Sequence, residues 1–200
     1  MKKSLVLFFL LHFTSTFSQN IDIELLRNIN LDRNVKLDNA FIAASSSVTP
    51  LFIATPAIML GIGLIKKDTA TVINSLFVGA SVFSSIVVST VLKKGINRTR
   101  PFITYPEIEK MTSAGSSSFP SGHTSRSFAL ATSLSLAYPK WYIIAPSFAW
   151  AGAVGYSRMH LGVHYPSDVL MGAIVGGGSA YLCYLGQKWV VNKLNKQDFR

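Results

Sequence analysis

Three blocks of the sequence place cations, histidines and a carboxylate at spacings that suit phosphoryl transfer. They are Lys93-x6-Arg100-Pro101, Pro120-Ser121-Gly122-His123 and Ser157-Arg158-x5-His164-x3-Asp168. A transferred phosphoryl group spreads negative charge over its oxygens, so its catalysis depends on positioning and electrostatic stabilisation. Lys93, Arg100 and Arg158 can supply three positive charges, and each arginine offers a planar fork of donors. Any one of them alone would be explained as a cation at the end of a membrane helix.

The third block holds the expected nucleophile. His164 and Asp168 are four residues apart, which places them on one face of a helix, and Pro166 suits its first turn. A carboxylate that holds one imidazole nitrogen leaves the other free to attack phosphorus. We therefore expect His164 to attack and Asp168 to orient it. His123 is the expected general acid, which would later activate water against a phosphohistidine. His160 is expected to be a packed or surface residue.

The segment around Ser121 and Gly122 is predicted to bind an anion. Small polar residues run through 116–123 into a helix that we expect to begin near Thr124. Backbone N–H groups and the positive dipole end at a helix start attract anions, and glycine permits a close approach. Without the other two blocks, the same segment would be interpreted as a serine-rich loop with a helix cap.

Long uncharged segments must position these blocks. They cover residues 40–65, 69–92, 127–139, 141–157 and 169–187. The first two are long enough to cross the hydrocarbon core of a bilayer, which needs about 20 residues. The third is short and is completed by upstream residues that include His123 and Arg126, and polar groups at that depth are costly and usually functional. We expect an all-α transmembrane bundle of five or six spans.

Loop charges predict which membrane face carries the blocks. Lys66 and Lys67, Lys140, and the basic residues after 187 lie at cytoplasmic positions if the positive-inside rule holds. The regions 93–124 and 157–168 then face the periplasm. Four cations cluster on this outer side against the rule: Lys93, Lys94, Arg98 and Arg100. That arrangement is expected if they hold an anion.

The N-terminus is typical of a secretory signal. Lys2 and Lys3 precede an apolar run, and a cut after Ser18 would make residues 1–18 a signal peptide. An uncleaved signal anchor is the alternative, with the same topology. Residues 21–38 predict a short amphipathic helix at the membrane surface or an ordinary capping segment. The length of the chain leaves room for one core, so residues 19–200 are expected to form a single membrane-embedded domain.

Composition narrows the class of protein. Only 14% of residues are charged, against about 25% in a typical soluble domain. The net charge of +10 fits a phosphate substrate or anionic lipid, and no single basic stripe predicts nucleic acid as a partner. Cys183 lies in an apolar run and is expected to be buried. No H-E-x-x-H or carboxylate cluster occurs, so we expect no metal and no other cofactor. The loop 102–119 is expected to be a flexible cover whose acidic residues are solvated.

In this order, the three blocks resemble the signature of the type 2 phosphatidic acid phosphatase superfamily. Its pattern is K-x6-R-P, P-S-G-H and S-R-x5-H-x3-D, and the sequence matches every position. The resemblance implies an all-helical bundle, no required metal, and phosphate held by Lys93, Arg100, Ser121, Gly122 and Arg158. It also implies His164 as nucleophile, His123 as general acid and Asp168 as orienter. Substrates of similar proteins include phosphatidic acid, phosphatidylglycerophosphate and undecaprenyl pyrophosphate.

The expected function is hydrolysis of a lipid phosphate or pyrophosphate at the periplasmic face of a bacterial inner membrane. A lipid phosphotransferase would need the same residues. Vanadate-dependent haloperoxidases and soluble acid phosphatases have similar anion pockets, but the membrane spans argue against both. A transporter or scaffold that kept the fold is the non-enzymatic alternative. Neither the lipid head group nor the oligomeric state is specified by the sequence.

Overall fold

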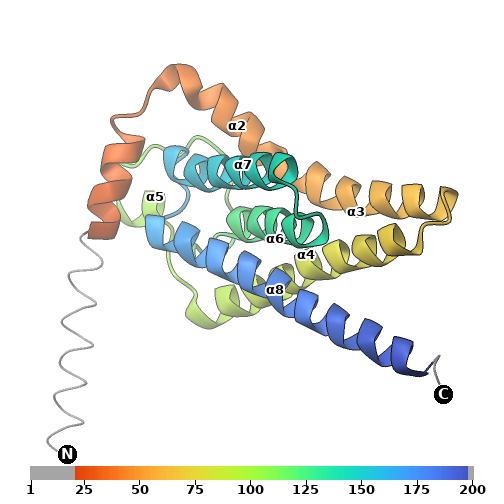
Figure 1. The fold of residues 1–200 in the computed structure, drawn as a ribbon. Coiled ribbons are helices and arrows are strands. Elements are labelled where there is room, and N and C mark those ends of the chain that lie inside the picture. The colour runs from red at the N-terminus through yellow and green to blue at the C-terminus, as the bar shows by residue number, and fades with distance from the viewer. Residues whose placement is uncertain (1–20, 198–200) are drawn as a thin grey trace, which may run out of the picture.

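The chain is a bundle of helices, and its longest connection covers residues 105–121 (Figure 1). A computed structural model describes residues 21–197, and no strand occurs in this range. The predicted signal peptide, 1–18, lies outside the described residues. The elements are a helix over 21–30, η1 (Val35–Leu37), α2 (Asp38–Ser46), α3 (Val48–Ile65), α4 (Thr69–Ile96), α5 (Pro101–Thr104), α6 (Gly122–Ala137), α7 (Trp141–His160) and α8 (Pro166–Gln197). The all-α prediction is confirmed.

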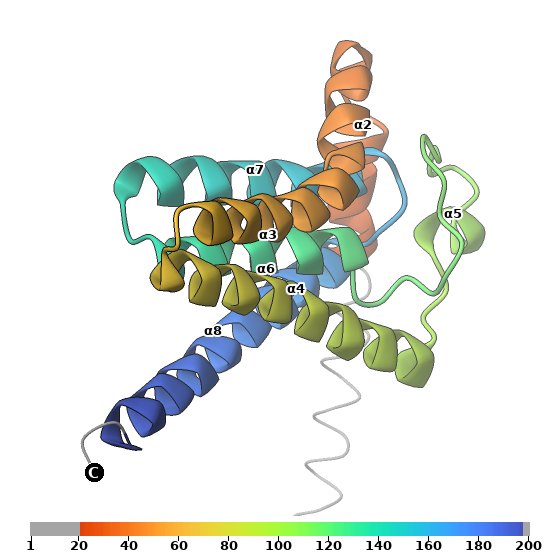
Figure 2. The ribbon, with the colours of Figure 1, turned by 90° about the vertical axis from the view of Figure 1, so that its right-hand side faces the viewer.

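The helix α6 lies at the centre of the bundle. It contacts α3, α4, α7 and α8, and Figures 1 and 2 show it enclosed by these longer helices. Its 16 residues make it about 24 Å long, shorter than a membrane's hydrocarbon core. Because neighbouring helices surround it, α6 can carry polar residues without exposing them to lipid. The polar groups of the second sequence block are therefore positioned by the best-protected helix of the bundle.

Three stretches of the described residues are long and apolar enough to cross a membrane: Val35–Ile65, Thr69–Thr104 and Pro166–Val191. Their outward side chains are large and apolar, including Leu76, Phe83 and Leu182, as a lipid-facing surface requires. The chain is thus a membrane-embedded helical bundle. The count of five or six spans stays a prediction, since α6 and α7 are not among these three stretches.

The uncharged segment 40–65 forms two helices, where the sequence predicted one. Figure 2 shows α2 turned away from α3, with the break at Ser47. Pro50 explains the break, because a proline lacks the N–H that would bond the carbonyl four residues earlier. The bond from Leu51 N to Ser47 O, 3.1 Å long, starts the new helix. The bend allows α2 to pack along α7 and to reach the end of the bundle that carries the three sequence blocks.

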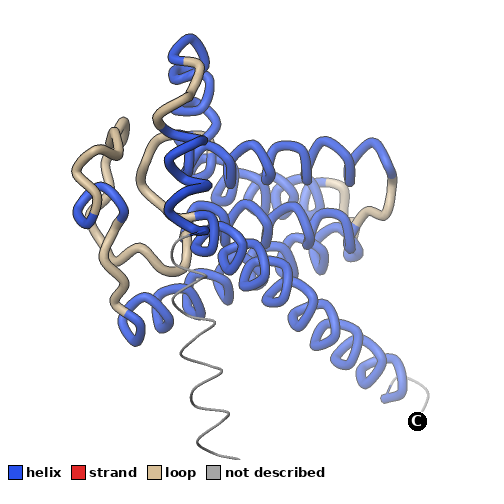
Figure 3. Tube along the Cα trace, turned by 90° about the vertical axis from the view of Figure 1, so that its left-hand side faces the viewer, coloured by secondary structure: helices blue, strands red, loops and turns tan. Residues whose placement is uncertain are grey.

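The ends of the helices bring the three sequence blocks together. The helix α4 ends at Ile96, and Asn97 stops it with a left-handed φ of 46°. The helices α6 and α8 begin at Gly122 and Pro166, while α7 ends at His160. Figure 3 shows the longer loops gathered at this one end of the bundle. Pro166 occupies the first helical position, as predicted from its missing N–H.

Small residues allow α6 and α8 to pack closely. A side chain added at Gly172 would collide with the Ser121 carbonyl, and one at Gly176 would collide with the Ser125 carbonyl. The Gly172–Gly176 pair therefore serves packing within the chain, as small residues do between membrane helices. This contact fixes the start of α8 against the start of α6, and those two helix starts carry Asp168 and His123.

The N-terminal helix covers the same end of the bundle. Its Ile23 and Leu26 are buried against Ile108 and Tyr165, so the segment caps the protein core. Asn30 fastens it further: its amide nitrogen donates to the His160 carbonyl at 2.9 Å. Of the two interpretations of this region, the capping segment agrees with these contacts.

The acidic residues of the loop that follows α5 are exposed, as expected, and they also form ion pairs that the sequence did not predict. Glu107 pairs with Arg27 at 2.6 Å, and Glu109 pairs with Arg33 at 2.5 Å. The backbone N–H of Glu109 also donates to the Asn30 side chain at 2.8 Å. These partners lie in the N-terminal segment, some 80 residues away in the chain, so no local sequence pattern could indicate them.

Candidate active site

Asp168 is a completely buried carboxylate surrounded by donors. Its Oδ2 accepts hydrogen bonds from Ser118 Oγ at 2.5 Å and from Tyr165 N at 3.0 Å. Its Oδ1 accepts from Arg98 Nη1 at 2.8 Å. A buried carboxylate with this many donors is fixed in place and keeps its charge paired. Asp168 can therefore act as a rigid acceptor for one further group, the imidazole of His164.

His164 lies between its expected orienter and a predicted phosphate ligand. Its Nδ1 is 3.4 Å from Asp168 Oδ2, and its Nε2 is 3.3 Å from Arg100 Nη1. A guanidinium can only donate, so Nε2 of a neutral His164 accepts, and the proton lies on Nδ1, which faces Asp168. His164 stands in the turn before α8 and is not on the helix itself, which corrects the expectation of a shared helical face.

The surroundings of His164 keep its ring neutral. Burial, opposed by the hydrogen bond to Asp168 and aided by the charge of Arg100, lowers the pKa of His164 to about 4. An ordinary histidine has a pKa of about 6.5. At neutral pH the Nε2 lone pair is therefore available for attack on an electrophile.

This pKa predicts the acid side of the pH profile. Activity should require neutral His164, so the loss of kcat/KM that its protonation causes, corrected for substrate ionisation, should begin only as the pH approaches about 4. The low pKa of His164 also makes the folded protein less stable in acid. The stability that its neutral ring contributes is fully present above about pH 6.5, the pKa in the unfolded chain, and is lost as the pH falls through the folded-state pKa of about 4. Initial rates across pH 4–8 test the first expectation, and a fall centred near 6.5 would contradict it.

The three predicted phosphate-binding cations lie near one another at this end of the bundle. Lys93 Nζ donates to the Ser117 carbonyl at 2.6 Å, and Arg100 donates to the Val163 carbonyl at 2.7 Å. Arg158 is bonded to Ser45 on α2. The charge of Arg100 acts on Lys93, Arg158 and His164 alike. Lys93 on α4, Arg158 on α7 and Arg100, just before α5, thus form one electropositive cluster, although their role in binding phosphate stays a prediction.

The start of α6 faces this cluster. Ser121 caps the helix, and its backbone N–H donates to the Asp168 carbonyl at 2.9 Å. A side-chain carbon at Gly122 would lie 3.8 Å from Lys93 Cε, so the glycine backbone and the lysine are neighbours. The Ser121 hydroxyl accepts a bond from Thr124 at 2.8 Å. The predicted anion site is therefore a helix start beside a lysine, a favourable pairing for phosphate.

His123, one residue into α6, is half-buried near the same charges. His164, Arg100 and Arg158 all act on it electrostatically. Both histidines and the three cations therefore lie at one end of the bundle. Lys94, another member of the predicted outer cluster of cations, is exposed.

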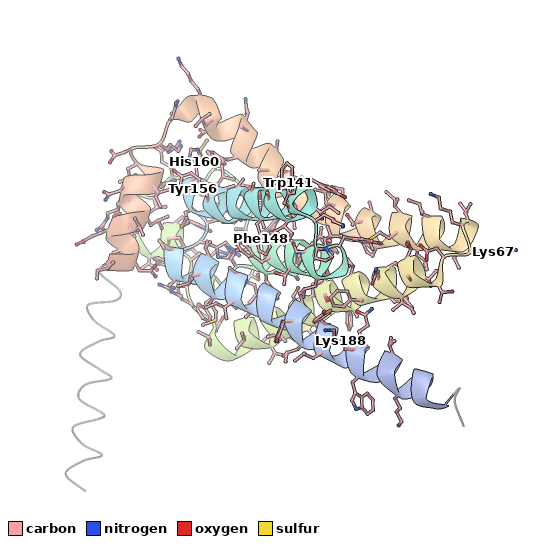
Figure 4. The ribbon with its side chains drawn as sticks, viewed as in Figure 1. Lys67, Trp141, Phe148, Tyr156, His160 and Lys188 are labelled. Atoms are coloured by element: carbon pink, nitrogen blue, oxygen red, sulfur yellow. The ribbon has the colours of Figure 1, made fainter. Side chains whose placement is uncertain are left out.

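His160 belongs to the packing, as expected. Its Nε2 is 2.7 Å from Asp38 Oδ1, and its ring lies 4.4 Å from that of Phe41. Figure 4 shows His160 and Tyr156 beneath α2, so the two side chains hold α2 against α7. The residue is 2% exposed and has different partners from His164.

Sequence reasoning missed the residues that hold Asp168. Arg98 was expected to help hold an anion, but its Nη1 binds Asp168 and its Nη2 binds Asp22 at 2.7 Å. Asp22 in turn accepts from the backbone N–H of Ser167 at 2.8 Å. Ser118 lies in the serine-rich segment, whose composition was the only available signal. Asp22 gave no signal, because its partners are far away in the chain.

Comparisons with known proteins agree with this geometry. A model of the PAP2 superfamily matches residues 74–191, which include all three blocks. The undecaprenyl-diphosphatase of Sulfolobus acidocaldarius is 30% identical over 171 residues, covering 82% of this chain and 78% of that protein. The crystal structure of a transmembrane phosphatidylglycerolphosphate phosphatase from Bacillus subtilis aligns with a TM-score of 0.69 and 26% identity, covering 94% of this chain and 96% of that one.

Other relatives match over shorter regions. The lipid A 4'-phosphatase of Bacteroides thetaiotaomicron is 40% identical over 70 residues, which is 35% of this chain and 31% of that protein. The chain spans less than half the length of the curated lipid A phosphatases that it matches.

Proposed function

Since the chain belongs to the PAP2 superfamily, we propose that it is a membrane phosphatase that removes phosphate from a lipid phosphate or pyrophosphate. Three similar proteins are named for undecaprenyl diphosphate, phosphatidylglycerolphosphate and lipid A. These molecules have different head groups, but each presents a phosphate that is anchored in a membrane. A bundle with apolar outer surfaces and an electropositive end suits such a substrate.

The contacts of the His164 ring carry this proposal. One ring nitrogen faces the fixed carboxylate of Asp168, and the other faces Arg100. When a substrate phosphate binds, Arg100 would donate to one of its oxygens instead of to Nε2. The Nε2 lone pair would then point at phosphorus. Lys93 and Arg158 would bind the remaining equatorial oxygens, where charge is greatest in the transition state.

The reaction then proceeds in two displacements. Nε2 of His164 forms a bond to phosphorus while the bond from phosphorus to the leaving oxygen breaks, and His123 protonates that oxygen. Asp168 stabilises the positive charge of the resulting phosphohistidine. His123, now neutral, takes a proton from water, whose oxygen attacks phosphorus and breaks the P–N bond. The products are the dephosphorylated lipid and inorganic phosphate.

We place the active site at the periplasmic face. Lys67 and Lys188 lie toward the end of the bundle remote from α5, as Figure 4 shows. Lys140, in the connection between α6 and α7, also belongs to that remote end. Positively charged connections favour the cytoplasm, so the end with His164 would face outward. A cleaved signal peptide at 1–18 or an uncleaved anchor is compatible with this orientation.

Phosphate release from a panel of lipids tests the function. Purified protein in detergent micelles should release inorganic phosphate from at least one of phosphatidic acid, phosphatidylglycerophosphate, undecaprenyl diphosphate and lipid A. Release should continue in EDTA, because the described residues include no group of three or more His, Cys, Asp or Glu side chains that could hold a metal. Binding of these lipids without any release would contradict the proposal.

The same panel separates two rival functions. Addition of an acceptor lipid would reveal a phosphotransferase, since labelled phosphate would then appear in lipid and not in solution. A transporter or scaffold of the same fold would release no phosphate and would not be affected by loss of His164.

A further inference from the structure

Arg126 is a half-buried cation that the proposed reaction does not use. It lies on α6, three residues after His123, and its guanidinium carbon is 5.5 Å from the centroid of the Phe52 ring. Its Nε is completely buried and has no hydrogen-bond partner among the described residues. No ion pair formed within residues 21–197 includes it. A buried donor without an acceptor costs free energy, so its retention needs an explanation.

Arg158 offers the explanation by analogy. Its Nε is the other buried side-chain donor without a partner in the described part of the chain. In the proposed function, Arg158 meets its acceptor when a substrate phosphate binds. The same reasoning applied to Arg126 requires a second anionic group. That group must lie close to the first, because the charge of Arg126 acts on both Lys93 and His123.

The position of Arg126 indicates on which side the second group lies. Arg126 is four residues along α6 from Gly122, which places it about 6 Å further down the helix axis. The direction leads away from the loops and into the bundle. For a lipid substrate, this is the side toward the hydrocarbon chain, where the leaving group must be.

A diphosphate has a charged leaving group. When His164 takes the terminal phosphoryl group of a lipid diphosphate, the bond to the bridging oxygen breaks and a lipid monophosphate departs. A lipid monophosphate substrate instead releases an uncharged alcohol. A cation on the leaving-group side of His123 therefore helps hydrolysis of the diphosphate. In hydrolysis of the monophosphate, the same cation has no charge to bind. We infer that Arg126 binds the second phosphate of a lipid diphosphate, the one that leaves with the lipid.

This inference rests on the proposed function, and matched substrates separate the two. Diacylglycerol pyrophosphate and phosphatidic acid share one lipid and differ by one phosphate. Full-length Arg126→Met, of similar size and without charge, should lose about 10- to 100-fold in kcat/KM for the pyrophosphate and change little for phosphatidic acid. Arg126→Lys should recover part of the loss. Phe52→Leu, which removes the ring but keeps the cation, is the control for a packing role.

Several outcomes would overturn the inference. They are equal losses on both substrates, no loss on the pyrophosphate, or a wild-type protein that hydrolyses only the monophosphate. Release of phosphate from neither substrate by the wild type would instead count against the proposed function.

A binding measurement covers the remaining case, in which the wild type hydrolyses only the pyrophosphate. Methylenediphosphonate and inorganic phosphate should both inhibit the wild type. Arg126→Met should weaken inhibition by the diphosphonate about tenfold and leave inhibition by phosphate unchanged. Equal inhibition constants in both proteins would reject a second phosphate site at Arg126.

Discussion

Replacement of His164 with asparagine is expected to lower kcat/KM by roughly ten-thousand-fold or more, because the variant has no atom that can form the covalent intermediate. Asparagine keeps a polar group near Nδ1 but places nothing at Nε2, the atom 3.3 Å from Arg100. The loss should appear in kcat, since Lys93, Arg100 and Arg158 still bind the phosphate. Phosphate release measured at saturating lipid checks this expectation.

Labelling tests the chemistry more directly than the rate does. Brief incubation with a ³²P-labelled lipid phosphate followed by quenching in alkali should leave label on the wild-type protein. The label should be lost in acid, as expected for a P–N bond, and it should be absent from His164→Asn. His123→Gln should still acquire label from an aryl phosphate, whose leaving group needs no proton. A labelled His164→Asn protein would assign the nucleophile elsewhere.

His160 provides a matched control. It is equally buried and lies four residues from His164, but it is bonded to Asp38. His160→Gln can keep that hydrogen bond, so the folded fraction should retain most of its activity. If His160→Gln and His164→Asn lost activity equally, the effect would reflect damage to this end of the bundle and not loss of a nucleophile.

Replacement of Arg98 with methionine is expected to cost about 3–5 kcal/mol of stability, a large part of the roughly 5–15 kcal/mol that holds a typical domain together. Arg98 lies between two carboxylates, at 2.7 Å from Asp22 and 2.8 Å from Asp168. Its guanidinium also stacks 3.8 Å above the Tyr165 ring. Without it, two buried carboxylates face each other with no cation between them.

Arg98 is a positioning residue, so its loss should also affect catalysis in a recognisable way. A displaced Asp168 no longer orients His164, which should lower kcat while KM for the lipid changes little. Unfolding in detergent and steady-state kinetics measure the two effects. Lys94→Met, which removes an exposed cation from the same end of α4, should change neither.

A double variant tests whether repulsion between the carboxylates is the cause. Addition of Asp22→Asn to Arg98→Met removes one of the two charges, so part of the lost stability should return. The alternative is that Asp22→Asn lowers the free energy of unfolding by the same amount in the Arg98→Met protein as in the wild type. In that case the two residues act independently, and the ion pair has no energetic role.

The sequence was informative wherever local spacing determines structure. Pro166 marked the start of α8, and three of the uncharged segments, 40–65, 69–92 and 169–187, lie within the stretches that could cross a membrane. The blocks around Lys93, His123 and His164 came together because each lies at a helix end, and helices of alternating direction bring such ends to one face of a membrane. Simple periodicity and charge were sufficient for these features.

The sequence failed where the partner of a residue lies far away in the chain. Asp22 binds Arg98 across 76 positions, and Arg33 binds Glu109 across a similar distance. Neither pairing has a local pattern, so Arg98 was assigned to the anion site and the ion pairs of the loop were not predicted. Tertiary contacts of this kind depend on how the N-terminal helix docks, which helix propensity does not determine.

The cluster of Lys93, Arg100 and Arg158 also affects how the protein responds to its own product. Three like charges held close together repel one another, and any small oxyanion that enters relieves that repulsion. Inorganic phosphate should therefore act as a feedback inhibitor and, by binding only the folded state, should raise the melting temperature. Buffers that contain phosphate would protect the protein during purification while concealing its activity in an assay.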